Sequence, residues 1–226
     1  MSSSEVVARE AARQLRVNES RVRQLAAAGE LPGRKVANRW LFDADAVERR
    51  GAQPPASGRP YGPRTAWGVL FLASDEPASW LRPDVRSRLR RRIREGLLSR
   101  DRGRLAKRAL ARYFAAGARA RAALARDPRF VRSGISAAAD HGASLRSPSV
   151  LEGYLPESDV EPFVYRSALR AVDERDADLI LRGVSGFWPF SGHRVAPKAV
   201  VAVDLLESLD QRTRRAGEEL LRRIER

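Results

Sequence analysis

Cysteine is absent from this chain of 226 residues, and histidine occurs only twice, as His141 and His193. The lack of cysteine excludes disulfides, thiolate metal sites and cysteine nucleophiles, and it fits a reducing cytoplasm. The two histidines lie far apart in the sequence, without a carboxylate pattern beside them. We therefore expect ordinary surface or core histidines, with no metal, no cofactor and no catalytic residue among them.

Long apolar stretches are also missing. No run of about 18 apolar residues occurs, and no apolar run follows a basic start, so neither a membrane span nor a signal peptide is expected. A glycine-rich phosphate loop and a Gly-x-Ser-x-Gly elbow are absent as well. These absences favour a cytoplasmic protein that does not contact membranes.

Positive charge, by contrast, is abundant and unevenly distributed. The net charge is +15, and residues 51–133 alone carry 20 Lys and Arg against 6 Asp and Glu. Residues 1–50 carry 10 Lys and Arg against 7 Asp and Glu, and residues 134–226 carry 13 Lys and Arg against 15 Asp and Glu. A field of this size attracts nucleic acid through counterion release and speeds the search for a site.

Residues 17–42 predict a short helix, a turn and a basic hairpin. Asn18 is placed to cap the helix, because its side-chain oxygen accepts from open backbone donors of the first turn. Val22 and Leu25 fall on one apolar face that needs a partner. The rest of the helix surface is polar, suited to a groove between phosphates, where arginine contacts guanine or backbone and glutamine contacts adenine; it carries Ser20, Arg21, Arg23 and Gln24.

The flanking segments complete a small domain. Residues 5–15 predict a first helix, and a three-residue turn separates it from the second, as in a helix-turn-helix. Residues 34–36 and 39–42 predict a two-stranded wing around Ala37-Asn38, because asparagine tolerates the positive φ of such a turn. Asp43 is expected to cap a third short helix.

Residues 4–50 resemble the winged helix-turn-helix of MerR and excisionase-type regulators. The matching residues are Glu10-Ala11-Ala12, Leu15, Val17, Ser20-Arg21-Val22-Arg23-Gln24-Leu25, Gly29, Leu31-Pro32, Val36 and Arg39-Trp40-Leu41. In that family the second helix enters the major groove, and the wing reaches neighbouring backbone or the minor groove. The resemblance implies double-stranded DNA as the partner. Flanking backbone would be held by Arg34, Lys35, Asn38 and Arg39.

The chain then predicts a linker and a basic helical segment. Residues 51–63 hold four prolines and three glycines, which indicates a linker. Residues 64–127 predict helices at 64–73, 80–98 and 104–126, the second of them covered with arginine. We expect Arg90, Arg91 and Arg92 to add DNA affinity without sequence preference; a merely solvated face is the alternative left open.

Residues 128–226 predict a small α/β domain with a short sheet, so the whole chain is expected to be α+β. Apolar strands are predicted at 130–132, 150–155 and 177–184, with helices between and after them, including one at 159–171. Trp188-Pro189-Phe190 is expected to be a packed loop that caps the core.

This half also resembles, over softer motifs, the C-terminal domain of AbiEi-type antitoxins. The matching residues are 131–138, Tyr154-Leu155, Val195-Ala196-Pro197, 201–208 and 214–218. Those proteins are transcriptional regulators of type IV toxin–antitoxin pairs whose toxin is a nucleotidyltransferase. The resemblance implies an autorepressing antitoxin with such a toxin as partner. Independently of it, we expect this near-neutral domain to serve partner contact or self-association, for example in a homodimer.

Two other functions stay open. Excisionase-like recombination directionality factors share the N-terminal module. A nucleotidyltransferase needs Gly-Ser followed soon by two carboxylates one residue apart for magnesium. The chain has Ser133-Gly134 in reversed order and Asp176-Ala177-Asp178 about forty residues later, a spacing that favours a polar loop. We therefore predict a non-enzymatic, sequence-specific DNA-binding regulator.

Overall fold

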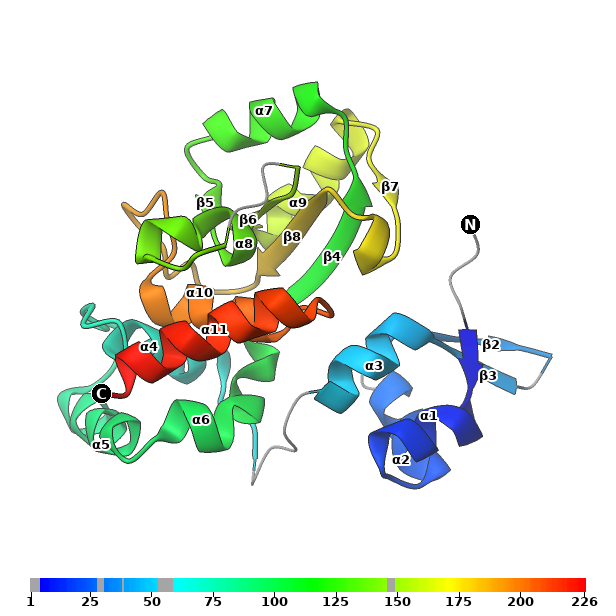
Figure 1. The fold of residues 1–226 in the computed structure, drawn as a ribbon, viewed down its shortest axis with the longest axis horizontal. Coiled ribbons are helices and arrows are strands. Elements are labelled where there is room, and N and C mark those ends of the chain that lie inside the picture. Colours follow the sequence, from blue (N-terminus) through cyan, green and yellow to red (C-terminus); the bar gives the residue numbers. More distant parts are fainter. Residues whose placement is uncertain (1–4, 28–30, 38, 53–58, 146–148) are drawn as a thin grey trace. The chain divides into compact units, whose positions relative to one another are not determined.

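A computed structural model describes residues 5–27, 31–37, 39–52, 59–145 and 149–226 (Figure 1). The chain divides into two compact units, residues 1–54 and 55–226. This boundary lies within the predicted linker 51–63, of which residues 53–58 fall outside the described residues. In the described ranges, no helix combines the length and apolar character needed to cross a bilayer.

The first unit combines helices with an antiparallel sheet whose strand order is β1-β3-β2. Its elements in chain order are β1 (Glu5–Val7), α1 (Ala8–Leu15), α2 (Glu19–Ala27), β2 (Gly33–Val36), β3 (Arg39–Asp43) and α3 (Ala44–Ala52). The prediction that residues 5–15 form one helix is wrong at its start. Val6 pairs with Phe42 of β3 and packs beside the core, because β-branched valines suit a strand that has a partner.

The two capping predictions in this unit and the predicted pairing of the hairpin strands are confirmed. The Asn18 Oδ1 accepts from the backbone N–H of Arg21 at 2.8 Å, and the Asp43 Oδ1 accepts from that of Ala46 at 2.7 Å. Val36 pairs with Arg39, so the predicted wing exists as a hairpin. Asn38, on which the turn prediction falls, lies outside the described residues. Ala37 before it has a positive φ of 44°.

The core of the first unit holds both helices of the helix-turn-helix against β3. Val22, Phe42 and Val47 are fully buried, and Leu25 is nearly so. Gly33 allows β2 to lie close to this core, since a Cβ there would stand 2.8 Å from the Phe42 ring. The apolar face predicted for α2 is therefore the face that positions this helix.

The second unit is built on a five-stranded sheet in the order β5-β6-β8-β4-β7, in which β6 and β8 run parallel and the other pairs antiparallel. Its strands are β4 (Leu110–Ala115), β5 (Val131–Arg132), β6 (Leu151–Pro156), β7 (Arg170–Ala171) and β8 (Leu179–Val184). Its helices are α4 (Pro63–Leu72), α5 (Pro83–Arg94), α6 (Leu97–Asp101), η1 (Arg102–Arg108), α7 (Ala118–Arg126), α8 (Gly134–Ala137), η2 (Ala139–His141), α9 (Glu157–Arg166), η3 (Glu174–Asp176), α10 (Lys198–Leu206) and α11 (Gln211–Ile224).

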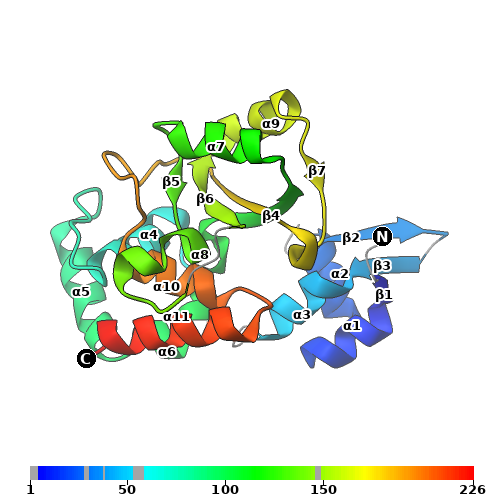
Figure 2. The ribbon, with the colours of Figure 1, turned by 45° about the horizontal axis from the view of Figure 1, so that its top comes forward.

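Helices cover both faces of this sheet (Figure 2). Leu181 of β8 packs with α7 and α9, whereas its neighbour Arg182 points to the opposite face, as strand alternation requires. That opposite side holds the larger core, formed by α4, α5, α6, α8, α10 and α11 around Trp67 and Phe190. The packed loop predicted at Trp188-Pro189-Phe190 is confirmed, because Phe190 is 1% exposed.

Three helix predictions need correction. Residues 104–126 do not form one helix: β4 interrupts them, because pairing with β8 outweighs the local helical pattern. The helix predicted at 80–98 begins only at Pro83, and Gly96, whose φ is +80°, separates α5 from α6. The helix predicted at 159–171 ends at Arg166, and residues 170–171 form β7. The helix at 64–73 and the strands at 150–155 and 177–184 are confirmed.

The arginine-rich helices share one core with the C-terminal helices. Residues of α4, α5 and α6 lie in the same apolar cluster as those of α10 and α11, and β4 belongs to the same sheet as β8. The predicted division between residues 64–127 and 128–226 is therefore not a boundary between compact units.

Candidate nucleic-acid interface

Helix α2 presents one polar face to solvent. Ser20, Arg21, Arg23 and Gln24 are all exposed, because Val22 and the rest of the apolar stripe face the core. Two turns of this helix therefore carry the predicted base-reading residues on one surface, and the packing of the opposite face against the core holds that surface in place. Side chains of this type match the donor and acceptor pattern of the major groove.

The contacts within this face are weak and local. The Arg23 Nη2 lies 2.8 Å from the Glu19 Oε2, and both side chains are about half exposed. The Arg21 Nη1 donates to the Gln24 Oε1 at 3.4 Å. Exposed pairs of this kind contribute roughly 0.2–1 kcal/mol. DNA phosphates or base edges can therefore replace these contacts at small cost.

The hairpin places its cations on two faces. Arg34 and Arg39 point to one side of the sheet, and Lys35 points to the other, because Arg39 pairs with Val36 and successive residues alternate. All three side chains are exposed. Asn38, the fourth predicted contact of the wing, lies outside the described residues. The wing can therefore offer Arg34 and Arg39 together to one phosphate backbone.

An acidic residue that sequence reasoning missed contacts the wing. Glu5 of β1 accepts two hydrogen bonds from Arg34, which raise the pKa of Arg34 and hold the pKa of the Glu5 carboxyl below its usual range. The prediction of a helix through residues 5–15 concealed this contact. An extended reading of Glu5-Val6-Val7 would have placed a carboxylate beside the hairpin.

The three α5 arginines predicted to contact DNA differ in their surroundings. The Arg92 Nη2 lies 3.2 Å from the Asp101 Oδ2, and the Arg92 side chain is 36% exposed. Arg91 is exposed and has Glu95 at 3.9 Å. Within the described part of the chain, Arg90 and its neighbour Arg94 have no carboxylate within 4.0 Å. Arg90 and Arg94 are therefore the cations of α5 most available to a phosphate.

The residues of the nucleotidyltransferase-like pattern do not converge. Ser133 is fully buried and donates to Asp204 of α10. Asp178 pairs with Arg121 at 2.7 Å, and Asp176 lies exposed in η3. Among the side chains that the structure describes, no group of three or more His, Cys, Asp or Glu is placed to hold a metal ion.

Comparison with known proteins agrees with the fold of the first unit. Residues 8–50, from the start of α1 into α3, match the family model of a helix-turn-helix domain. No curated protein and no solved structure significantly matches the chain. The N-terminal unit therefore contains a helix-turn-helix domain, which supports a DNA-binding regulatory role. The predicted resemblance of residues 128–226 to AbiEi-type antitoxins gains no support from this match.

Proposed function

We propose that this chain is a sequence-specific regulator of transcription that binds double-stranded DNA through α2. The observation that carries the proposal is the exposed polar face of α2 within a domain that matches the helix-turn-helix family. Arg21 and Arg23 would contact guanine or backbone, and Gln24 would contact adenine, with Ser20 beside them.

The remaining cations would supply affinity rather than sequence choice. Arg34 and Arg39, on one face of the hairpin, and Lys35, on the other face, would contact phosphates beside the site. The arginines of α5 would add a salt-dependent contribution common to all sequences. The proposal needs neither catalysis nor a cofactor, and it places the protein with its DNA in the cytoplasm.

The test is a measurement of specificity, not of affinity alone. The full chain first selects sites from a random duplex library. The ratio of its affinity for these sites to its affinity for shuffled duplexes is then measured at fixed salt for the wild type, Arg23→Ala and Gln24→Ala. Losing one base contact should lower the ratio of affinities by about fivefold or more, since each good contact contributes roughly 1–3 kcal/mol of discrimination.

A matched control separates base reading from charge. Arg166→Ala removes the same charge from an exposed position at the end of α9, and it should leave the ratio unchanged. If Arg23→Ala and Gln24→Ala also leave the ratio unchanged, α2 does not read bases. If the wild type selects no sequence at all, the regulator proposal fails.

The antitoxin role is the finer part of the proposal. It rests on the sequence resemblance of residues 128–226, which implies a nucleotidyltransferase toxin as partner and repression of the chain's own operon. Co-expression with the adjoining reading frame tests it. Rescue of growth together with repression of the shared promoter would support the role, and toxicity without rescue would remove it.

An excisionase-like directionality factor is the alternative that shares the helix-turn-helix domain. Such a protein would bend its site and favour excision by an integrase, and circularly permuted duplexes measure that bend. The nucleotidyltransferase alternative predicts transfer of a labelled nucleotide, lost in the double variant Asp176→Asn and Asp178→Asn.

A further inference from the structure

The second unit contains a cavity of about 600 Å³ between the sheet and the start of α11. Apolar side chains form much of its wall, among them Tyr113 of β4, Ile180 of β8 and Leu209 before α11. Its size lies within the roughly 300–1,000 Å³ that is usual for small-molecule sites. The cavity therefore has the room and the apolar wall that an organic ligand needs.

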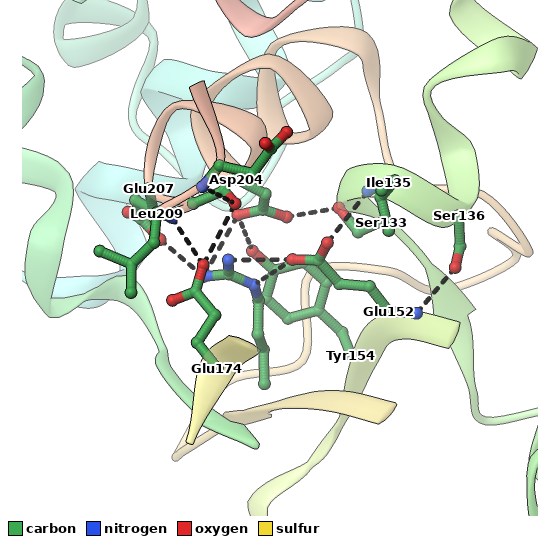
Figure 3. Close-up of polar contacts among 12 residues, drawn as sticks. Ser133, Ile135, Ser136, Glu152, Tyr154, Glu174, Asp204, Glu207 and Leu209 are labelled. Carbon is green, nitrogen blue, oxygen red and sulfur yellow. Dashed lines mark hydrogen bonds and ion pairs between the residues drawn. The ribbon is translucent and has the colours of Figure 1, made fainter. Parts of the chain in front are cut away.

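A buried network of charges forms the polar end of this cavity (Figure 3). Arg182 donates to the Glu152 Oε1 through Nε at 3.1 Å and Nη2 at 3.0 Å, and to the Glu207 Oε2 through Nη1 at 2.6 Å. Arg108 lies 2.7 Å from the Asp204 Oδ1 and 2.7 Å from the Glu207 Oε1. Of these five residues, Glu152, Arg182 and Asp204 line the cavity itself.

The network has one more carboxylate than guanidinium. Glu152, Asp204 and Glu207 face Arg108 and Arg182. Burial raises the pKa of the Glu152 carboxyl, although the nearby Arg182 charge opposes this shift. The negative form of this carboxyl is therefore costly where it is buried, and a further positive group beside it would favour that form.

This negative excess lies inside a strongly basic unit. Residues 55–226 carry 33 Lys and Arg against 21 Asp and Glu. Around the cavity, Glu174 and Asp210 are balanced in formal charge by Arg175 and Arg212. The Arg182 nitrogens already donate to carboxylates, so Arg182 offers little to an anion. The polar end of the cavity is therefore suited to a positive group.

We propose that this cavity binds a small organic cation. Its apolar or aromatic body would lie against Tyr113, Ile180 and Leu209. Its positive group would lie beside Glu152, whose Oε2 accepts one hydrogen bond, from the backbone N–H of Ile135 at 2.9 Å. The attraction is effective because the Glu152 side chain is only 5% exposed, and charges interact more strongly where little water surrounds them. This site goes beyond the proposed DNA binding and does not depend on it.

Three probes of one shape and different charge test the proposal. Benzamidine is a cation, benzamide its neutral counterpart and benzoate an anion, and calorimetric titration of the full chain without DNA measures each. Benzamidine should bind at least about tenfold more tightly than benzamide, a difference of roughly 1.4 kcal/mol, and benzoate should bind more weakly still. Equal affinities, stronger binding of benzoate or no binding by benzamidine would overturn the proposal.

Two obstructing variants locate the site. Ala177→Phe and Leu209→Trp each place a large side chain at the cavity wall, and either should abolish benzamidine binding while the protein still unfolds cooperatively. Ala122→Phe, on the exposed surface of α7, is the control and should bind normally. Unchanged binding by a folded obstructing variant would place the cation elsewhere. DNA selection by the same protein reports separately on the first unit.

Discussion

Arg34 and Glu5 form a two-point ion pair across the sheet of the first unit. The Arg34 Nε lies 2.8 Å from the Glu5 Oε1, and its Nη2 lies 3.0 Å from the Glu5 Oε2. The residues belong to β2 and β1, which flank β3 on opposite sides. Glu5 therefore orients the guanidinium of the wing and also neutralises its charge.

We predict that Glu5→Gln strengthens DNA binding for all sequences alike. Without the carboxylate, Arg34 is free to contact a phosphate, and one more counterion is released when DNA binds. The expected results are an affinity gain of a few fold at low salt and a slope of log K against log salt that is steeper by about 0.9. Fluorescence anisotropy over a salt series measures both quantities.

The control for this prediction is Glu10→Gln on α1. Glu10 pairs with Arg13 instead of the wing, at 2.7 Å, and its removal changes the net charge by the same amount. An equal gain in both variants would mean that net charge, and not the release of Arg34, explains the effect.

The second prediction separates the arginines of α5 by their partners. Replacing both Arg90 and Arg94 by glutamine should reduce the salt slope by about one to two, because each phosphate contact contributes about 0.9. Arg92→Gln should change the slope little, since Asp101 already neutralises that side chain. If the double variant keeps the wild-type slope, this face of α5 is merely solvated.

How much of the fold can be predicted from the sequence depends on how far apart along the chain the interacting residues lie. Asn18 and Asp43 were predictable caps, because each acts on a donor three residues away. Strands β1 and β4 were not, because their partners β3 and β8 lie far along the chain. Periodicity alone therefore assigned helix to both segments.

The candidate DNA-binding face was predictable for the same reason. The polar side of α2 is a property of one helix, and its neighbours in sequence fix it. The buried charge network joins residues from η1, β6, β8 and the end of α10, so no single segment indicates it. Its one local sign is Asp204 within the otherwise apolar segment 199–206, since a charge there needs a buried partner.

The third prediction concerns that network. Asp204→Ala should lower the free energy of unfolding of the second unit by roughly 3–5 kcal/mol, because buried donors of Arg108 and Ser133 lose their acceptor, at a cost of roughly 1–3 kcal/mol each. The hydroxyl of Tyr154 also loses its acceptor, at 2.7 Å. Urea denaturation followed by tryptophan fluorescence measures the change. Asp84→Ala, which breaks exposed pairs on α5, should cost less than about 1 kcal/mol; similar losses would mean that burial does not set the cost.

The fourth prediction is a pH dependence at the start of α11. Asp210 accepts from the Thr213 hydroxyl at 2.6 Å and from the Thr213 backbone N–H at 2.7 Å, and these hydrogen bonds lower the pKa of Asp210. A carboxyl whose pKa is lower in the folded state contributes its full stabilisation of the fold when the pH is above its unfolded pKa of about 3.9. That stabilisation is lost as the pH falls through the folded value.

Asp210→Ala should therefore lower the free energy of unfolding by about 1 kcal/mol near neutral pH, as loss of an N-cap usually does, and by much less under strong acid. Asp210→Asn keeps a capping oxygen without a titrating group, so its stability should vary less with pH than that of the wild type. Thermal unfolding at a series of pH values measures both variants. A constant difference between wild type and Asp210→Ala at every pH would contradict the assigned role of the carboxylate.

The last prediction compares substitution by glycine at the C-cap of α1, Arg16, with the same substitution inside the helix, at Arg13. Arg16 ends the helix in the left-handed region, with φ 55° and ψ 40°, and its N–H donates to carbonyls of the last turn. A Cβ is unfavourable in this conformation and glycine avoids the strain. Arg16→Gly should therefore protect the α1 amides by up to about 1 kcal/mol in hydrogen exchange of the full chain. Arg13→Gly, within the regular helix, should instead cost about 1 kcal/mol. Effects of the same sign would show that the left-handed residue does not decide the end of this helix.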